Sequence, residues 1–406
     1  MQDYHIYCHI PFCKKRCRYC YFTAKFKEHE MVNLKNLDSY VDALVKNISE
    51  TDIANGQLQS IVFGGGTPSL LNKDQLHKII DAIHSKVSDA VFEKLQHMAY
   101  EVSPDTASLE TLSSFRNVGF NRISIGVQSF DDNELKILGR PYNNKAIKDA
   151  MTNIRKLKYD LINVDLLIGI PGQTKESIIF SVNEALMLRP EHLSISLFYK
   201  SYPGGSDFVE DCEKKGYKIL DIDDKIEVYE EICMLIKDAG YERIDNTVFS
   251  LPGYIFTYEK DSICGTEAVL AFGPGSSGYW NGVIRYTPPE IEKYIEKPEC
   301  VCKGFSVETN AYATIWGHLN AYGYIKEDEI IKNFNLNIEQ LIKQDFSVEK
   351  LIVSLKNYNL IDCLDKKYCI RPEAINKAIV IMQHCKDEWG YRLITAPNKL
   401  QTEVRK

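Results

Sequence analysis

The chain has 406 residues, 44% hydrophobic and 26% charged, which is typical of a folded globular protein and long enough for more than one domain. Its net charge of −7 argues against non-specific binding to nucleic acid. No export signal and no apolar run long enough to span a membrane are visible, so the 12 cysteines favour a reducing cytoplasm over a disulfide framework.

The first half of the chain alternates strand-like apolar runs with segments of helical periodicity. The expected strands are Tyr4–His9, Ser60–Phe63, Met98–Val102, Arg122–Gly126, Ile162–Ile168 and His192–Phe198. The expected helices are Leu37–Ile48, a helix capped by Asn72 or Asp74 that runs through Ile83, Ser108–Phe115, Asp132–Leu138, Asn144–Lys158 and Thr174–Leu188. Six strands joined by helices predict a parallel sheet with right-handed crossovers, either an open doubly wound sheet or a partial barrel.

The positions of the distinctive residues favour the barrel. They follow successive strands or lie within them: a cysteine loop, Gly64–Thr67, Glu101, Gln128, Asp165 and Tyr199. Such a distribution is typical of the catalytic face of a β/α barrel, whereas an open sheet would concentrate these residues at one switch point. We therefore predict an α/β protein built on a partial (β/α) barrel.

The second half of the chain has a less regular pattern. Between 200 and 307 we expect one helix, Asp223–Ala239, and otherwise connections that fold back over the barrel mouth. Helices at Leu336–Ile342, Val348–Asn357 and Glu373–Cys385, with a hairpin at Ile361–Ile370, predict a small winged-helix-like α+β domain. The predicted divisions are a barrel core at 1–200, a capping and connecting region at 201–307, a C-terminal domain at 308–395 and a polar tail at 396–406.

Cys13, Cys17 and Cys20 have the spacing C-x3-C-x2-C within one short loop. Three thiolates from one loop suit three corners of a cubane iron–sulfur cluster and leave one iron open to a substrate or cosubstrate. The alternatives are a zinc site, for which no second pair of cysteines or histidines has a suitable spacing, and buried structural thiols. The basic run Lys14-Lys15-Arg16 in this loop fits either a solvated edge or contact with an anionic partner.

Further polar and glycine residues follow the later strands. Gly64–Thr67 permits either a tight strand-to-helix turn or the close approach of a ligand to the backbone. Glu101 would be costly to bury unpaired, and at a barrel mouth it can bind ribose hydroxyls or an ammonium group. Gln128, Arg140 and Asp165 offer an amide, a cation and a carboxylate, or else form an ordinary polar network.

Taken together, these motifs resemble those of the radical S-adenosylmethionine (SAM) enzymes of the oxygen-independent coproporphyrinogen III oxidase family. The matching segments are Tyr7–Phe22, Phe63–Ser69, Tyr100–Val102, Gly126–Phe130, Gly139-Arg140 and Asp165–Gly172. The cysteine spacing is shared by the whole radical SAM superfamily, and the combined set is more specific. The resemblance extends over the barrel through the turn Gly273-Pro274-Gly275.

The resemblance implies a 4Fe–4S cluster held by Cys13, Cys17 and Cys20. It implies SAM contacts at Tyr7, Tyr19, Gly65 and Glu101, and a second SAM molecule at Gly66, Thr67, Gln128, Arg140 and Asp165. The reaction implied is reductive cleavage of SAM to a 5′-deoxyadenosyl radical that acts on a porphyrin-like or heteroaromatic small molecule. A flavodoxin or ferredoxin would supply electrons, and no membrane or nucleic-acid partner is expected.

The resemblance leaves three reactions open. The porphyrinogen decarboxylases carry a further cysteine where this chain has Phe22. In this respect the chain is closer to the haem chaperones and to the radical methyltransferases, which use two SAM molecules. The chaperones carry a His-Asn-x-x-Tyr-Trp element ahead of the Gly-Pro-Gly turn, where this chain has Tyr254–Cys264. The main prediction is therefore an enzyme that alters a porphyrin-like or heteroaromatic substrate, with methyl or methylene transfer from a second SAM. The alternatives are haem handling and coproporphyrinogen III decarboxylation.

Overall fold

The computed structural model describes residues 3–20, 26, 31–53, 56–198, 200, 205–245, 247–256, 258, 268–280, 283–303, 307–364 and 367–385. Phe22, Tyr199 and the predicted polar tail at 396–406 lie outside the described residues. Within the described part of the chain, no helix combines the length and the apolar character that crossing a membrane requires.

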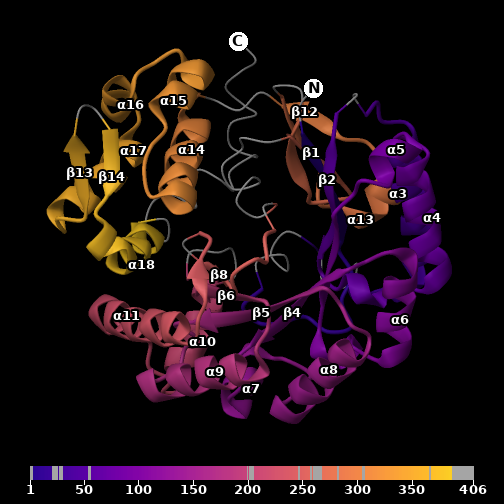
Figure 1. Cartoon of the computed structure of the whole chain (residues 1–406), viewed down its shortest axis with the longest axis horizontal. Helices are drawn as coiled ribbons and strands as arrows, with labels where there is room; N and C mark the ends of the chain where they lie inside the picture. The colour runs from indigo at the N-terminus through magenta and orange to yellow at the C-terminus, as the bar shows by residue number, and fades with distance from the viewer. Residues whose placement is uncertain are drawn as a thin grey trace.

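The central feature of the fold is a curved nine-stranded sheet, which confirms the predicted partial barrel (Figure 1). Its strands have the order β7-β8-β6-β5-β4-β3-β2-β1-β9. The first six are β1 Tyr4–Ile10, β2 Leu58–Gly65, β3 His97–Val102, β4 Arg122–Gln128, β5 Leu161–Ile168 and β6 His192–Leu197. Each of these strands pairs in parallel with the next one along the chain, so their carboxyl ends lie at one edge of the sheet.

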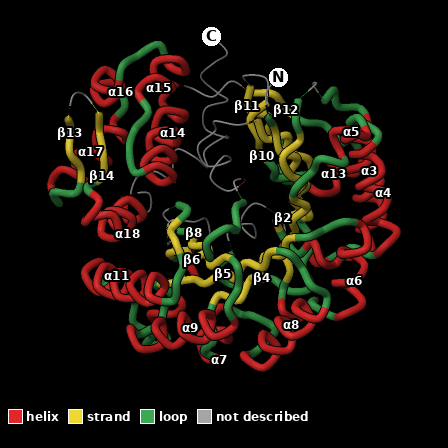
Figure 2. Tube along the Cα trace, in the orientation of Figure 1, coloured by secondary structure: helices red, strands yellow, loops and turns green. Residues whose placement is uncertain are grey.

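Helices cover the convex side of this sheet (Figure 2). They are α3 Leu37–Ser49, α4 Lys73–His84, α6 Leu109–Val118, α7 Asp132–Leu138, α8 Asn144–Lys156, α9 Lys175–Leu188 and α11 Ile222–Asp238. Shorter turns occur at η1 Leu34–Asn36, η2 Pro68–Leu70, α5 Asp89–Phe92 and η3 Pro104–Thr106. The strands read as nearly continuous apolar runs because both of their faces are buried, which is the rule for parallel sheets.

Side-chain caps fix where several of these helices begin. Asn72 accepts a hydrogen bond from the backbone N–H of Gln75, whose side chain bonds back to the Asn72 N–H, and together they form a capping box at the start of α4. Ser108 caps α6, and Thr174 caps α9 in the same way. These caps confirm the helix starts that the sequence predicted for this half of the chain.

The prediction of irregular connections between 201 and 307 was wrong. This stretch contains β7 Glu242–Arg243 and β8 Val248–Ser250, which add antiparallel strands beside β6, and β9 Ala268–Phe272, which pairs in parallel with β1. It also contains α10 Gly205–Lys214, α13 Ile291–Glu296 and a three-stranded antiparallel sheet of β10 Ser277–Trp280, β11 Val283–Tyr286 and β12 Val301–Lys303. The five residues of β9 are all buried, so this segment is a core strand.

The last part of the chain forms a group of helices with one hairpin. Its elements are α14 Val307–Tyr322, α15 Glu327–Phe334, α16 Ile338–Gln344, α17 Phe346–Asn357, β13 Ile361–Leu364, β14 Lys367–Ile370, η4 Pro372–Ala374 and α18 Ile375–Cys385. It contains the three predicted helices and the predicted hairpin, and two further helices, α14 and α15, precede them. Helix α18 packs against α11 of the barrel layer (Figure 1). This contact holds the C-terminal helices beside the open side of the barrel. The predicted boundaries between the divisions of the chain stay predictions.

Candidate functional site

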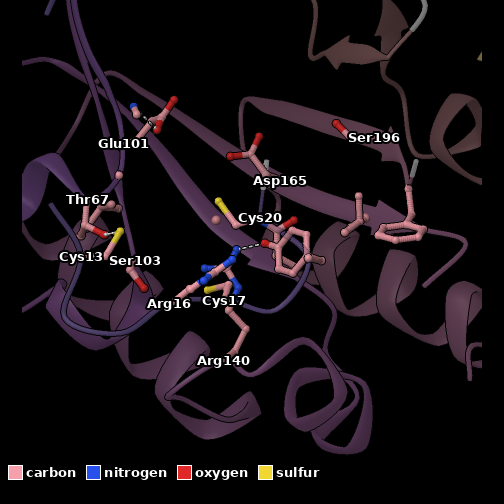
Figure 3. Close-up of a pocket in the computed structure, with 18 of the residues that line it drawn as sticks. Cys13, Arg16, Cys17, Cys20, Thr67, Glu101, Ser103, Arg140, Asp165 and Ser196 are labelled. Carbon is pink, nitrogen blue, oxygen red and sulfur yellow. Dashed lines mark hydrogen bonds between the residues drawn. The ribbon is translucent and has the colours of Figure 1, made fainter. Parts of the chain in front are cut away.

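A cavity of about 510 Å³ opens at the edge of the sheet where the parallel strands end. Its wall includes these predicted site residues: Cys13, Cys17, Tyr19, Cys20, Gly65, Gly66, Thr67, Glu101, Gln128, Arg140 and Asp165. They come from the loop after β1, from strands β2 to β5 or the turns that follow them, and, for Arg140, from the segment between α7 and α8. Figure 3 shows Thr67, Glu101, Arg140 and Asp165 around the three cysteines. Residues that the sequence places about 150 positions apart therefore share one wall, as a β/α barrel requires.

The three cysteines lie in the loop that follows β1, all of them partly exposed toward the cavity. The Arg18 backbone N–H donates to the Leu138 carbonyl at 3.0 Å, and the Arg18 side chain donates to Asp211 of α10, so the loop is fastened to α7 and α10. Burial raises the pKa of the Cys13 thiol to about 12, although the Thr67 hydroxyl, 3.5 Å from the Cys13 sulfur, acts in the opposite direction.

The turn after β2 must consist of glycines because the backbone of Ile10 and Phe12 passes directly against it. A β-carbon at Gly66 would lie 2.6 Å from the Phe12 carbonyl oxygen and 2.8 Å from that of Ile10. Gly65 has a φ of +108°, and a β-carbon there would lie 2.5 Å from the nearest ring atom of His9. Only glycine lets the cysteine loop approach β2 this closely. The turn therefore both places the loop and opens the backbone toward the cavity.

Glu101, at the end of β3, is held beside this turn. One of its carboxylate oxygens accepts a hydrogen bond of 3.1 Å from the Gly65 backbone N–H. Tyr7 is absent from the described residues that line the cavity, but it lies directly beneath Gly64 and next to Glu101, and its hydroxyl is 3.0 Å from His9 Nδ1. Burial and the nearby Glu101 charge raise the pKa of Tyr7 well above its usual value, so its hydroxyl stays protonated.

Arg140 brings a positive charge to the cysteine loop. Its guanidinium group donates a hydrogen bond to the Tyr19 hydroxyl and lies over two rings, 5.3 Å from the centre of Tyr19 and 5.6 Å from that of Tyr142. Its Nε atom is buried without a hydrogen-bond partner. Gln128 has a φ of +68° at a bulge in the β4–β5 pairing, and this conformation turns its side chain back over Gly126 toward Arg140.

Asp165 is oriented by a buried polar network on the concave face of the sheet. Its two carboxylate oxygens accept hydrogen bonds of 2.7 Å from the Ser124 hydroxyl and from the Asn163 amide. Asn163 in turn accepts a hydrogen bond of 3.0 Å from the Ser194 hydroxyl. The carboxylate is therefore fixed from two neighbouring strands, which is how a binding group on a barrel strand is kept rigid.

The site suits an iron–sulfur cluster and SAM in its donor chemistry. In a cubane cluster each thiolate binds a different iron, so three cysteines spaced along one loop suit it. Burial raises the pKa of the Cys13 thiol, and a bound iron would stabilise its thiolate. Beside the cysteines, Glu101 and Asp165 offer acceptors, and the unpartnered Arg140 Nε offers a donor, for the polar groups of SAM.

Comparisons with known proteins show the family of the chain. Residues 7–185 match the model of the radical SAM superfamily. The haem chaperone HemW of Bacillus subtilis is 30% identical over 293 residues, which cover 71% of this chain and 74% of that protein. The oxygen-independent coproporphyrinogen III oxidase of Salmonella typhimurium is 28% identical over 362 residues, covering 80% and 76%. The structure of coproporphyrinogen III oxidase (HemN) from Escherichia coli matches with a TM-score of 0.72 at 20% identity and covers 95% of this chain and 90% of that chain.

The fold, the cysteine loop and these matches define a radical SAM protein. More narrowly, the chain belongs to the family that contains the HemW haem chaperones and the HemN-type coproporphyrinogen III oxidases. Its cofactors are accordingly a 4Fe–4S cluster and SAM, and its activity involves a small-molecule substrate and a reductant.

Several residues of the site were missed in the sequence. Asn163 and Ser124 are spaced two residues from Asp165 and Gly126, so the alternation of a strand could have placed them on the concave face. Trp316, Asn320 and Gln383 also line the cavity, but they come from the C-terminal helices, and no local pattern predicts where those helices dock. Thr247, between β7 and β8, also lines the cavity.

Proposed function

We propose that this protein is a radical SAM enzyme that acts on a porphyrin-like or heteroaromatic substrate. The observation that carries the proposal is the single cavity lined by the three cysteines, the glycine turn, Glu101, Arg140 and Asp165. When bound, a reduced cluster supplies the electron that cleaves SAM to a 5′-deoxyadenosyl radical. The names of the relatives, a haem chaperone and a coproporphyrinogen oxidase, support a porphyrin-like molecule as the substrate.

We assign roles to the chain's own residues from their contacts. Cys13, Cys17 and Cys20 would hold the cluster, and the Thr67 hydroxyl beside Cys13 would stabilise that thiolate. Glu101 and Gly65 would hold the first SAM, together with Tyr7 and Tyr19. The enclosed wall would keep water from the reacting atoms and orient the substrate bond that loses hydrogen.

A second SAM would contact Gly66, Thr67, Gln128, Arg140 and Asp165. The rigid hydrogen bonds of Asp165 and the buried, unpartnered Arg140 Nε support a ligand on this side of the cavity. In this proposal the second SAM donates a methyl or methylene group to the substrate. A low-potential flavodoxin or ferredoxin would be the reductant, and a reducing cytoplasm would be the compartment that keeps the thiols reduced.

The test is product analysis under strictly anaerobic conditions. Reconstituted protein is incubated with dithionite, SAM and a panel of porphyrins and heteroaromatic compounds, and the products are identified by mass spectrometry. The proposal predicts 5′-deoxyadenosine together with an altered panel member, and S-adenosylhomocysteine if the second SAM transfers a methyl group. If no panel member changes while 5′-deoxyadenosine accumulates, the substrate class is wrong. A vinyl product from coproporphyrinogen III would instead assign decarboxylation.

Haem handling is a second candidate, favoured by the 30% identity to HemW over 74% of that protein. It predicts stoichiometric haem binding without chemical change of the macrocycle. A haem titration followed by absorption spectroscopy distinguishes the two functions. A saturable shift at one haem per chain, with no altered porphyrin product, would favour the chaperone, and the absence of any shift would exclude it.

A further inference from the structure

The C-terminal helices contribute three residues to the wall of the cavity. Trp316 and Asn320 come from α14, four positions apart and so on one helix face, and Gln383 comes from α18. The barrel therefore does not enclose the cavity alone, and this part of the wall lies on a different element from the proposed cluster and SAM contacts. This separate origin indicates a separate binding task for the C-terminal part of the wall.

Two of these side chains are buried amides whose carbonyl oxygens have no hydrogen-bond partner. Asn320 is 2% exposed and Gln383 is 5% exposed, yet the carbonyl oxygen of each side chain accepts no hydrogen bond. Other amides of the same domain are satisfied, since Asn337 and Gln340 bond each other's backbone in the capping box of α16. Buried amides without partners are rare because each one costs free energy. Two of them on one cavity wall point to a ligand that satisfies both.

The charge on the cavity wall is divided between its two sides. The described lining residues of the C-terminal helices are uncharged. The charged ones come from the barrel side, where Lys14, Lys15 and Arg16 lie in the cysteine loop and Glu101 and Asp165 on the strands. An amide presents both a donor and an acceptor but no charge. The C-terminal wall thus suits an uncharged hydrogen-bonding edge, while the basic loop suits carboxylate substituents of the same molecule.

We propose that Asn320 and Gln383 bind the uncharged polar edge of the substrate and select it. This assignment rests on the porphyrin-like substrate of the proposed function. The wall is held in place by the packing of α18 on α11 and by a hydrogen bond of 2.5 Å from the Arg243 guanidinium to Asn376 of α18. The C-terminal domain is therefore part of the substrate site, with its amides at a fixed distance from the barrel.

The test compares isosteric variants of the reconstituted full-length protein. Asn320→Leu and Gln383→Met, singly and together, remove the amides at nearly constant volume, and Gln344→Met removes an exposed amide at the end of α16 as a control. Binding of coproporphyrin III and of SAM is measured by anaerobic titration. Thermal unfolding is recorded without porphyrin. Each single variant should bind coproporphyrin III about 3- to 10-fold more weakly, the worth of one neutral hydrogen bond. SAM affinity should be unchanged.

The unfolding temperature separates a binding role from a structural one. An unpartnered buried amide destabilises the ligand-free protein, so its replacement by an apolar isostere should leave the midpoint unchanged or raise it. Provided that the unsubstituted protein binds coproporphyrin III, either of two results for the Asn320 and Gln383 variants would overturn the assignment. One is a lowered unfolding midpoint, and the other is an affinity for coproporphyrin III equal to that of Gln344→Met. If the unsubstituted protein itself does not bind coproporphyrin III, the porphyrin substrate of the proposed function fails and this assignment fails with it.

Discussion

Replacement of Gly66 by alanine tests whether the glycine turn places the cysteine loop. The new β-carbon would lie 2.6 Å from the Phe12 carbonyl oxygen, 2.8 Å from the Ile10 oxygen and 2.9 Å from the Phe12 nitrogen. All three are backbone atoms, so no side-chain rotation relieves the contact. Because carbon atoms prefer contacts of about 3.5 Å, the loop must move by about 1 Å, directly beside Cys13.

Two effects lower the stability of the Gly66→Ala variant. Overpacking of this kind costs about 1–3 kcal/mol, and displacement also strains the 2.8 Å hydrogen bond from the Gly66 N–H to the Ile10 oxygen, worth about 1 kcal/mol. We therefore expect the unfolding free energy to fall by about 2–4 kcal/mol. Metal sites tolerate ligand shifts of only about 0.2 Å, so iron incorporation should fall below about half of that in the unsubstituted protein.

The assay is iron and sulfide content per chain after anaerobic reconstitution, with denaturant unfolding in parallel. Gly240→Ala is the control, because that glycine has a φ of +89° but nothing within 4 Å of its β-carbon position. It should lose about 1 kcal/mol of stability through backbone strain and keep its iron. If Gly66→Ala incorporates as much iron as Gly240→Ala, the glycine turn does not position the loop.

Three more substitutions address the neighbouring contacts. Asn163→Leu removes one hydrogen bond to Asp165 and leaves the Ser194 hydroxyl unpaired. The unfolding free energy measured in urea should therefore fall by about 1–3 kcal/mol, and SAM should bind more weakly in a titration. An unchanged SAM affinity would show that Asp165 does not contact SAM. Arg140→Lys loses the planar contacts to Tyr19 and Tyr142 and should weaken SAM binding about tenfold, whereas an equal affinity would remove Arg140 from the site. Burial and the nearby Arg122 lower the pKa of His192 to about 3, so the unfolded state binds more protons below pH 6.5, and stability should drop as the pH falls from 6.5 toward 3. His192→Asn should drop less over that window in urea unfolding at graded pH, and an identical slope would contradict this reasoning.

The barrel strands were predictable because burial on both faces makes each parallel strand a distinct apolar run. The caps at Asn72, Ser108 and Thr174 likewise act through contacts within a few residues. In contrast, β9 was missed although Ala268–Phe272 is apolar, since glycine-rich sequence follows it and its partner β1 lies more than 250 residues earlier. Pairing over such a separation leaves no local signal.

The residues of the functional site also include some that the sequence predicts and some that it does not. The cysteine loop, Gly65 and Glu101 were predictable because parallel strands bring their carboxyl ends to one edge, so position along the chain gives position in space. Asn320 and Gln383 were not, because they reach the cavity only through the docking of α18 on α11. Their residue types also did not indicate a binding role, since buried amides in helices usually form hydrogen bonds within the protein.

The most direct test of the account is formation of 5′-deoxyadenosine by the reconstituted protein with dithionite, SAM and a porphyrin, compared with Cys13→Ala, Cys17→Ala and Cys20→Ala. The account predicts that the unsubstituted protein forms 5′-deoxyadenosine, faster in the presence of the porphyrin that is altered. Each cysteine variant should form none. Equal 5′-deoxyadenosine formation by any of the three variants, or none by the unsubstituted protein with an intact cluster, would contradict the central claim.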